Sequence, residues 1–437
     1  MGVDVSLKVK SLTLLYWKSF FDEKTLRMFF NQSDLRINNN VKYNINDKDE
    51  KPHAEYKYVS TVGNVIDRLN SIGYTLKNVK KRFNNNVFDI INYYDFDEDD
   101  SVIRQRIEKN VTFKKWSNSV KKYSNFLLNN DEDLYYFWEL EDHGSPESLK
   151  PKTFCDRIVF NSLKDTQSDS YFGCLYEKFD SINIVRLILE YCDKKNIVEV
   201  DVSEMVGWTY DSIDDMRITD NIEKTMVLVE GSSDKTILEF ALKNIYPHLS
   251  NLYYFMDFDY STNNTRQGGA DAIAKNIETF ITSKLNAKFI AIFDNDAIGI
   301  QSQKALLYKI GNLPENYKIT NYPPIKDANK YPTILPDKKI KLMDINSMAC
   351  SIELYLPKQL ITDGSNNLYP IQWKNIVERK IGNEKLSDYQ GEIQHKDEIK
   401  SSFMSLKNDI ENGKKEFNID NWKNIKTIID HIIHIFD

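Results

Sequence analysis

The stretch KFIAIFDNDAIGIQS, residues 288–302, decides the fold, because an apolar run within it ends abruptly in acidic residues. The run from Phe289 to Phe293 is apolar at every position, as in a strand that is buried on both faces of a parallel sheet. Asp294 and Asp296 follow directly, and two such carboxylates repel each other and lose hydration unless a cation lies between them. The stretch therefore predicts a buried strand that ends at a cation site.

From Lys224 onward, apolar runs alternate with helical patterns. In chain order they are TMVLVEG, DKTILEFALKNIY, LYYFMDFD, GGADAIAKNIETFITSKL, KFIAIFDND and SQKALLYKIG. Strands that alternate with helices of this length indicate βαβ units and a parallel sheet. In such sheets, ligands bind at the carboxyl ends of the strands.

A second strand of this region also ends in acid. The apolar residues 226–229 lead into Glu230, and Asp234 lies four residues further on. Because parallel strands end at one edge of the sheet, we expect these carboxylates to converge with Asp294 and Asp296. Hard carboxylate oxygens without histidine or cysteine suit Mg²⁺ or Mn²⁺. The sequence therefore predicts one or two such ions at this edge.

Two features at this edge also have purely structural explanations. Asp296 or Asn295 could simply cap the helix that begins near Ile298, as in an ordinary strand-to-helix turn. If the metal site exists, we expect Asn295 to be a spacer that faces away from it. Gly268 and Gly269 precede another helix, where backbone N–H groups could bind a phosphate or could form no more than a tight turn.

Composition narrows the class of protein. The chain has 437 residues, enough for two or three domains, and its formal net charge of -7 argues against binding to nucleic acid through bulk positive charge. The four cysteines lack zinc-ligand spacing, so we expect them to be reduced. Since no apolar stretch is long enough for a membrane span and the first residues lack a secretory signal, we expect a cytoplasmic protein without a membrane partner.

The pattern of apolar and polar residues changes twice along the chain, which predicts three segments. Residues 1–220 mix short strands with amphipathic segments and are expected to form an α+β N-terminal domain. Residues 221–360 hold the alternating strands and helices, and residues 361–437 are predicted to be a helical C-terminal segment that completes the same region. Within the second segment, the Pro- and Lys-rich stretch 321–341 is too broken for a helix.

Three other features could bind ligands, but simpler explanations are favoured. Residues 111–123 interleave lysines with aromatic residues, which would suit nucleic acid, yet the aromatic residues fall on one helix face, as in a core. The acidic run at 95–100 is typical of a solvated loop or helix start. His431 and His434 share one face of an apolar helix, and packing is favoured over metal ligation.

Four motifs, in this order, resemble the Toprim domain. They are VEGSSDKTIL (229–238), GGADAI (268–273), FDNDAIG (293–299) and SIELYL (351–356). Toprim domains are the catalytic modules shared by topoisomerases, primases and OLD-type nucleases. The resemblance covers about residues 224–400 and implies an α/β fold with a Rossmann-like parallel sheet flanked by helices.

The finer pattern is similar to that of OLD-like nucleases. Asp234 stands four residues after Glu230, Glu353 lies in an IE-Y context, and Lys396 in IQHKDEIKSSF matches a lysine near the end of the pattern. The resemblance implies metal-dependent hydrolysis of phosphodiester bonds. Lys396, or a lysine from residues 326–341, would neutralise charge on the phosphate.

Under this hypothesis, five carboxylates share two metal ions. Glu230, Asp294 and Asp296 would hold one Mg²⁺, while Asp234 and Glu353 would help to hold a second. A metal-bound water is the expected nucleophile, because a metal lowers the pKa of Glu230 and so weakens it as a general base.

The opening MGVDVSLKVKSLTLLYW, residues 1–17, looks like the start of HEPN/Toprim-associated proteins, a group linked to anti-phage defence. No arginine is followed by a histidine at the spacing of HEPN ribonucleases, so we expect no active HEPN site. OLD nucleases carry an ATPase ahead of the Toprim domain, whereas this chain has no G-x-x-x-x-G-K-[ST] motif. A separate ATPase, another defence-system protein and a second copy of the chain are therefore candidate partners beside nucleic acid.

The leading interpretation is an antiviral Toprim nuclease that cuts DNA, or RNA such as tRNA. Metal ligands contact phosphate and do not distinguish among these substrates. Two alternatives stay open. One is a primase-like nucleotidyl transferase, against which the lack of zinc-ribbon cysteines counts, and the other is a regulatory or nucleic-acid-binding subunit activated by a partner ATPase.

Overall fold

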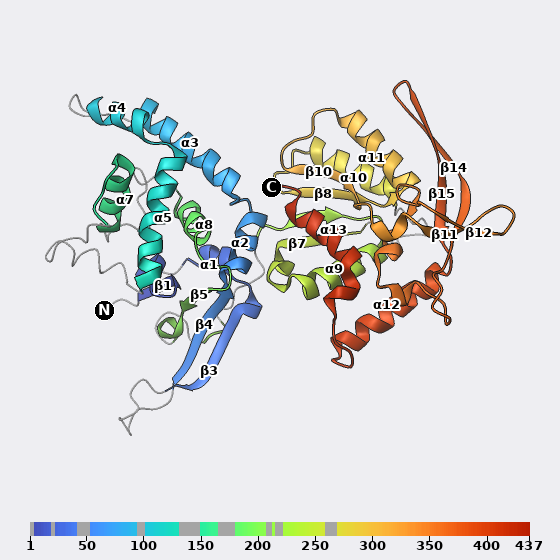
Figure 1. The fold of residues 1–437 in the computed structure, drawn as a ribbon, viewed down its shortest axis with the longest axis horizontal. Coiled ribbons are helices and arrows are strands. Elements are labelled where there is room, and N and C mark those ends of the chain that lie inside the picture. Colours follow the sequence, from blue (N-terminus) through green and yellow to red (C-terminus); the bar gives the residue numbers. More distant parts are fainter. Residues whose placement is uncertain are drawn as a thin grey trace. The chain divides into compact units, whose positions relative to one another are not determined.

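The computed structural model describes residues 4–18, 22–41, 53–93, 101–130, 149–164, 180–206, 212–214, 222–257 and 269–437. The chain divides into two compact units, residues 1–222 and 223–436, and Figure 1 shows the elements of both. Among the helices of the described ranges, none is long and apolar enough to cross a membrane. The acidic run at 95–100 and Gly268 lie outside these ranges.

The first unit is built on a five-stranded antiparallel sheet with the order β2-β1-β5-β4-β3. The strands are β1 (Asp4–Val9), β2 (Leu12–Lys18), β3 (Leu35–Val41), β4 (His53–Thr61) and β5 (Ile197–Asp201). Val198 and Val200 on β5 are buried and their neighbours are more exposed, as expected where one face of a sheet packs on a core. The last strand of the unit thus lies at the centre of its sheet.

Helices complete the first unit. They are α1 (Glu23–Phe29), α2 (Val62–Ser71), α3 (Leu76–Tyr93), α4 (Ser101–Asn110), α5 (Phe113–Asn130), α7 (Phe154–Lys164) and α8 (Ser181–Leu189), with short 3-10 turns η1 (Gln32–Asp34) and η4 (Ser203–Met205). On α5, Trp116 is buried and stacks on Phe83, with 4.6 Å between ring centroids. Lys114, Lys115 and Lys121 are exposed. The core interpretation of residues 111–123 is therefore confirmed.

The second unit contains a parallel sheet, as predicted. Its strands are β6 (Thr225–Leu228), β7 (Tyr253–Met256), β8 (Phe289–Phe293) and β10 (Tyr317–Asn321), in the order β10-β8-β6-β7. All neighbouring strands run parallel. All five residues of β8 are buried, because helices cover both faces of this sheet (Figure 1).

Helices flank this sheet on both faces (Figure 1). They are α9 (Ser232–Ile245), α10 (Ala270–Thr282), α11 (Ala297–Ile310) and α13 (Lys423–His434). α10 and α11 bury Ile273 and Leu306 in a core that includes Phe293 of β8. α9 and α13 contact each other on the other face (Figure 1). There, His431 Nε2 lies 2.9 Å from Thr320 Oγ1, which agrees with packing rather than metal ligation.

The prediction that residues 361–437 are helical is wrong for residues 371–393. There, β14 (Ile371–Ile381) and β15 (Glu384–Ile393) form an antiparallel hairpin. The hairpin belongs to a sheet with β11 (Tyr331–Ile334) and β12 (Ile340–Met343), in the order β12-β11-β14-β15. Its turn is Gly382-Asn383, and Gly382 has a φ of 59°, as a two-residue hairpin requires. The α-helices of this segment are α12 (Lys396–Glu411) and α13.

Short elements complete the second unit. β9 (Asn295–Asp296) pairs with β13 (Ala349–Cys350). The 3-10 turns of this unit are η5 (Pro247–Leu252), η6 (Lys326–Ala328), η7 (Ile352–Tyr355), η8 (Lys358–Leu360) and η9 (Ile419–Trp422). Cys350 is a buried free thiol, as are Cys155 and Cys192 in the first unit, while Cys174 lies outside the described ranges.

Candidate active site

Glu230 and Asp294 meet at the carboxyl edge of the parallel sheet. Glu230 stands two residues after β6, and Asp294 directly follows β8. Because these strands are neighbours, Glu230 Oε1 accepts a hydrogen bond from the backbone N–H of Asp294, with an N···O distance of 3.0 Å. The two strand ends that carry acid in the sequence therefore touch.

Asp294 leaves a buried carboxylate oxygen unsatisfied. Its Oδ1 atom is buried and has no hydrogen-bond partner in the described part of the chain. Its backbone is held firmly, since its carbonyl oxygen accepts a hydrogen bond from Asn321 Nδ2 at 2.9 Å. A Cβ atom at Gly299 would collide with the same carbonyl oxygen, so a glycine is required there. A buried, unpaired carboxylate oxygen costs free energy, which a cation would offset.

Asp296 does cap the following helix. Its Oδ1 accepts a hydrogen bond from the Gly299 N–H at 2.7 Å, and its Oδ2 accepts one from Gln390 Nε2 at 2.7 Å. The capping explanation is thus correct for this residue. Each carboxylate oxygen has a second lone pair, so capping does not prevent Asp296 from also binding a cation.

Asn295 between the two aspartates bonds to a different part of the chain. It is 2% exposed, and its Oδ1 accepts a hydrogen bond of 3.0 Å from the Ser347 N–H. Its Nδ2 donates to Asn346 Oδ1 at 3.2 Å. Asn295 therefore fixes the loop and leaves the two aspartates to form the acidic cluster.

Asp234 and Glu353 are buried acids with protein partners. Asp234 lies in the first turn of α9 and accepts a hydrogen bond of 2.8 Å from the Tyr322 hydroxyl. Glu353 on η7 is 1% exposed, and Ser351 Oγ donates to it at 2.6 Å. Two lysines of α12 also approach Glu353, with Nζ···O distances of 3.4 Å for Lys396 and 3.6 Å for Lys400.

Burial and mutual repulsion raise the pKa values of the cluster. Burial, with the neighbouring carboxylates adding to it, raises the pKa of Glu230 to about 8 and that of Asp234 to about 6. The pKa of Asp294 is raised well above its usual range by burial and then by Glu230, and burial also raises that of Asp296. Burial alone would lower the pKa of Lys396, but the surrounding carboxylates outweigh it and raise the pKa. Without a cation, these carboxyls therefore keep their protons to a higher pH than exposed carboxyls do.

The donor set fits a hard divalent cation, although the side chains are not yet gathered around one point. Within the described ranges, no three His, Cys, Asp or Glu side chains are grouped closely enough to hold a metal ion. Glu230 instead faces the Asp294 amide, and Glu353 faces the lysines. The unpaired Asp294 Oδ1 and the all-oxygen chemistry are what would suit Mg²⁺ or Mn²⁺.

Gly269 does not offer a free phosphate donor. It precedes α10 with a φ of 90°, a conformation that favours glycine. Its N–H donates to the carbonyl oxygen of Glu230 at 2.8 Å, so this donor is already used. The tight-turn explanation accounts for Gly269.

Lys396 lines a hollow at the start of α12. The hollow has a volume of about 490 Å³ and lies between this helix and the hairpin, with Lys374 and Glu392 as an ion pair at its side. The alternative, a lysine from residues 326–341, has less support, because no lysine of this stretch forms an ion pair with a described acid of the cluster, and Lys339 pairs with Asp337 at the surface. Among the described residues, Lys396 and Lys400 of α12 are the lysines that form ion pairs with the acidic cluster.

Sequence reasoning missed the residues that hold the acids in place. Tyr322 and Asn321 lie at the end of β10, so the rule that strand ends meet at one edge could have found them. Lys400 is one helical turn after Lys396, so the two lysines lie on the same helix face; this spacing was a weaker indication that Lys400 also contacts the acids. Gln390 reaches Asp296 from the hairpin that was not foreseen, and no local pattern marks it.

Comparison with known proteins gives one match. The family model described as HEPN/Toprim N-terminal domain 1 matches residues 1–223. No curated protein and no solved structure matches the chain.

Proposed function

The chain belongs to the family defined by HEPN/Toprim N-terminal domain 1, and from this premise we propose that its second unit is a metal-dependent nuclease of the Toprim type. The family name supports a nuclease-related role for the protein. The observation that carries the proposal is the unpaired, buried Oδ1 of Asp294 beside Glu230, at the carboxyl edge of a parallel sheet. That edge is where α/β sheets bind their ligands.

Each acid has a distinct role in this proposal. Glu230, Asp294 and Asp296 would hold one Mg²⁺ or Mn²⁺, and Asp234 and Glu353 would contribute to a second site. A bound divalent ion supplies charge stabilisation for the phosphate and lowers the pKa of a coordinated water.

The residues around the acids would orient them. Tyr322 fixes one Asp234 oxygen, and Gln390 with the Gly299 amide fixes both oxygens of Asp296. Lys396 would move from Glu353 toward a substrate phosphate, whose charge it would help to neutralise. Fixed ligands reduce the reorganisation that a reaction otherwise requires.

Cleavage assays test this proposal. Purified protein is incubated with labelled DNA, total RNA and tRNA in Mg²⁺, in Mn²⁺ and in EDTA. Asp294→Asn keeps the size of the side chain but removes its charge, and it is expected to abolish metal-dependent cleavage. Asp271→Asn is the matched control, because the Asp271 side chain is 89% exposed. Equal cleavage by both variants would contradict the proposal.

A partner-activated form of the same enzyme is our second candidate. Glu353 is engaged by two lysines, and Glu230 by an amide, so the acids of the isolated chain are not gathered for catalysis. A separate ATPase in an anti-phage system would be the activating partner. Copurification from cells, followed by cleavage assays with and without the captured protein, distinguishes this form from a free-standing nuclease.

A further inference from the structure

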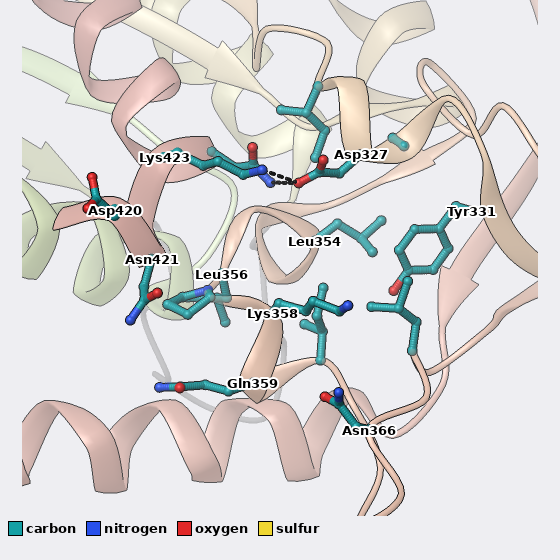
Figure 2. Close-up of a pocket in the computed structure, with 16 residues that line it drawn as sticks. Asp327, Tyr331, Leu354, Leu356, Lys358, Gln359, Asn366, Asp420, Asn421 and Lys423 are labelled. Carbon is teal, nitrogen blue, oxygen red and sulfur yellow. Dashed lines mark hydrogen bonds and ion pairs between the residues drawn. The ribbon is translucent and has the colours of Figure 1, made fainter. Parts of the chain in front are cut away.

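The second unit contains a cavity that the proposed chemistry leaves unused. Its volume of about 690 Å³ lies within the range of about 300–1,000 Å³ that is usual for ligand-binding cavities. Figure 2 shows it between η6, the η7–η8 segment and the turn that leads into α13.

The floor of this cavity is apolar apart from one hydroxyl. Ile325, Leu354 and Leu356 line it and are at most 5% exposed. Tyr331 also lines it and is 3% exposed, but its buried hydroxyl has no hydrogen-bond partner in the described part of the chain. The hydroxyl points toward the cavity in Figure 2. A ligand acceptor there would remove the cost of an unpaired buried donor.

The rim carries two lysines, Lys358 and Lys423. Lys423 and Asn424 both contact Asp327, at 3.2 Å and 3.1 Å, so Lys423 is neutralised. Lys358 is exposed and makes no ion pair with any residue that the structure describes, although its charge contributes to the lowered pKa of Asp327. Its amine and the Tyr331 hydroxyl extend toward each other in Figure 2. An anionic group in the cavity would therefore be attracted to Lys358.

Side-chain amides complete the lining. Gln359, Asn366 and Asn421 border the cavity, and Figure 2 shows them along its lower and left sides. An amide offers both a donor and an acceptor, which suits the polar edge of a heterocycle. The lining thus combines an apolar floor, amide groups and the amine of Lys358.

We infer that this cavity binds a nucleotide, with its phosphate between the Lys358 amine and the Tyr331 hydroxyl and its base on the apolar floor. The nucleotide has two possible sources: a free nucleotide that acts as an effector, or one nucleotide of a bound strand. The second source rests on the proposed nuclease function, and the first does not.

The cavity and the acidic cluster share structural elements. Leu354 lines the cavity, and the preceding residue Glu353 pairs with Lys396. Asn346 hydrogen-bonds to the N–H of Ile325 in the cavity wall at 3.0 Å and to Asn295 between the aspartates at 3.2 Å. A nucleotide in the cavity would therefore contact the same segment that holds the candidate metal ligands.

The test measures binding rather than cleavage. The full chain is titrated calorimetrically with the four ribonucleoside 5′-monophosphates in EDTA, and in a second arm with a single-stranded oligonucleotide in EDTA. Tyr331→Phe removes only the unpaired hydroxyl, so it is expected to fold normally and to weaken binding about tenfold. Lys358→Ala should weaken it by a similar factor, whereas Lys304→Ala, an exposed lysine on α11, should not.

The outcomes distinguish a free nucleotide from a bound strand, and they test the cavity proposal separately from the nuclease proposal. If the Tyr331 and Lys358 variants weaken the binding of monophosphates, the ligand of the cavity is a free nucleotide. If they weaken only the binding of the oligonucleotide, the ligand is one nucleotide of a bound strand. If neither arm depends on these residues, the cavity is not a nucleotide site. Asp294→Asn should keep this binding in EDTA while losing cleavage, so failure of the cavity proposal and failure of the nuclease proposal give different results.

Discussion

Glu230→Gln is expected to remove a pH dependence from the stability of the metal-free second unit. Burial raises the pKa of Glu230 to about 8, against 4.5 for an ordinary glutamate, so the native protein retains a proton that the unfolded chain loses. The stability from this proton is fully present below about pH 4.5 and is lost as the pH rises through about 8. The slope is about 1.4 kcal/mol per pH unit, so up to about 4 kcal/mol is lost between about pH 5 and about pH 8.

The glutamine side chain does not ionise in this pH range. The variant is therefore a direct reference for the pH dependence that Glu230 adds to the stability of the second unit. The two proteins should be equally stable near the acidic end of this window, and the variant should be the more stable one at the alkaline end. Hydrogen exchange of the β6 and β8 amides in EDTA, compared at each pH, reads the stability of this unit alone. Added Mg²⁺ should stabilise the wild type at the alkaline end and have little effect on the variant.

Glu384→Gln serves as the control, because Glu384 is exposed at the hairpin turn and its variant should follow the wild type. Parallel profiles for the wild type and Glu230→Gln across the window would refute the reasoning. They would mean that Glu230 is ionised in the native protein without a metal, and that the acidic cluster is better solvated than its burial indicates.

Three further substitutions test residues that contact the acidic cluster or its backbone. Gly299→Ala forces a Cβ against the Asp294 carbonyl, so it should destabilise the second unit by about 1–3 kcal/mol in thermal unfolding, whereas Gly364→Ala, in open space, should not. Tyr322→Phe removes the donor to Asp234, which should cost about 1–3 kcal/mol and weaken Mn²⁺ binding in calorimetry. Lys396→Met should lower the cleavage rate at saturating substrate by about 10²–10³-fold, and Lys396→Arg should restore part of it.

The parallel sheet and its acidic edge could be predicted because their determinants are local. An apolar run such as 289–293 marks a buried strand, and parallel strands place their ends together whatever lies between them. The position of Glu353 was available only through a family resemblance, because η7 is a short turn without periodicity. The sequence therefore predicts strand ends better than turns.

The missed elements depend on contacts between distant residues. The bond from Tyr322 to Asp234 spans 88 residues, and that from Gln390 to Asp296 spans 94. The hairpin at 371–393 is mostly exposed on β14, so apolar alternation could not reveal it. Gly382-Asn383 was the one local indication, since a Gly-Asn pair between two strand-like runs is typical of a hairpin turn.

The hydrogen bonds of the acids show which carboxyl group the proposed cation would satisfy. Asp234, Asp296 and Glu353 each have donors from the chain, and Glu230 accepts from an amide. Asp294 is the member of the cluster with a buried oxygen that no described group satisfies. Its backbone carbonyl accepts a hydrogen bond from Asn321 Nδ2 at 2.9 Å, which helps to hold the loop in this position. A divalent ion at this oxygen would replace the proton that burial favours on Asp294 and would satisfy the unpaired oxygen, which is why we propose Asp294 as the central ligand.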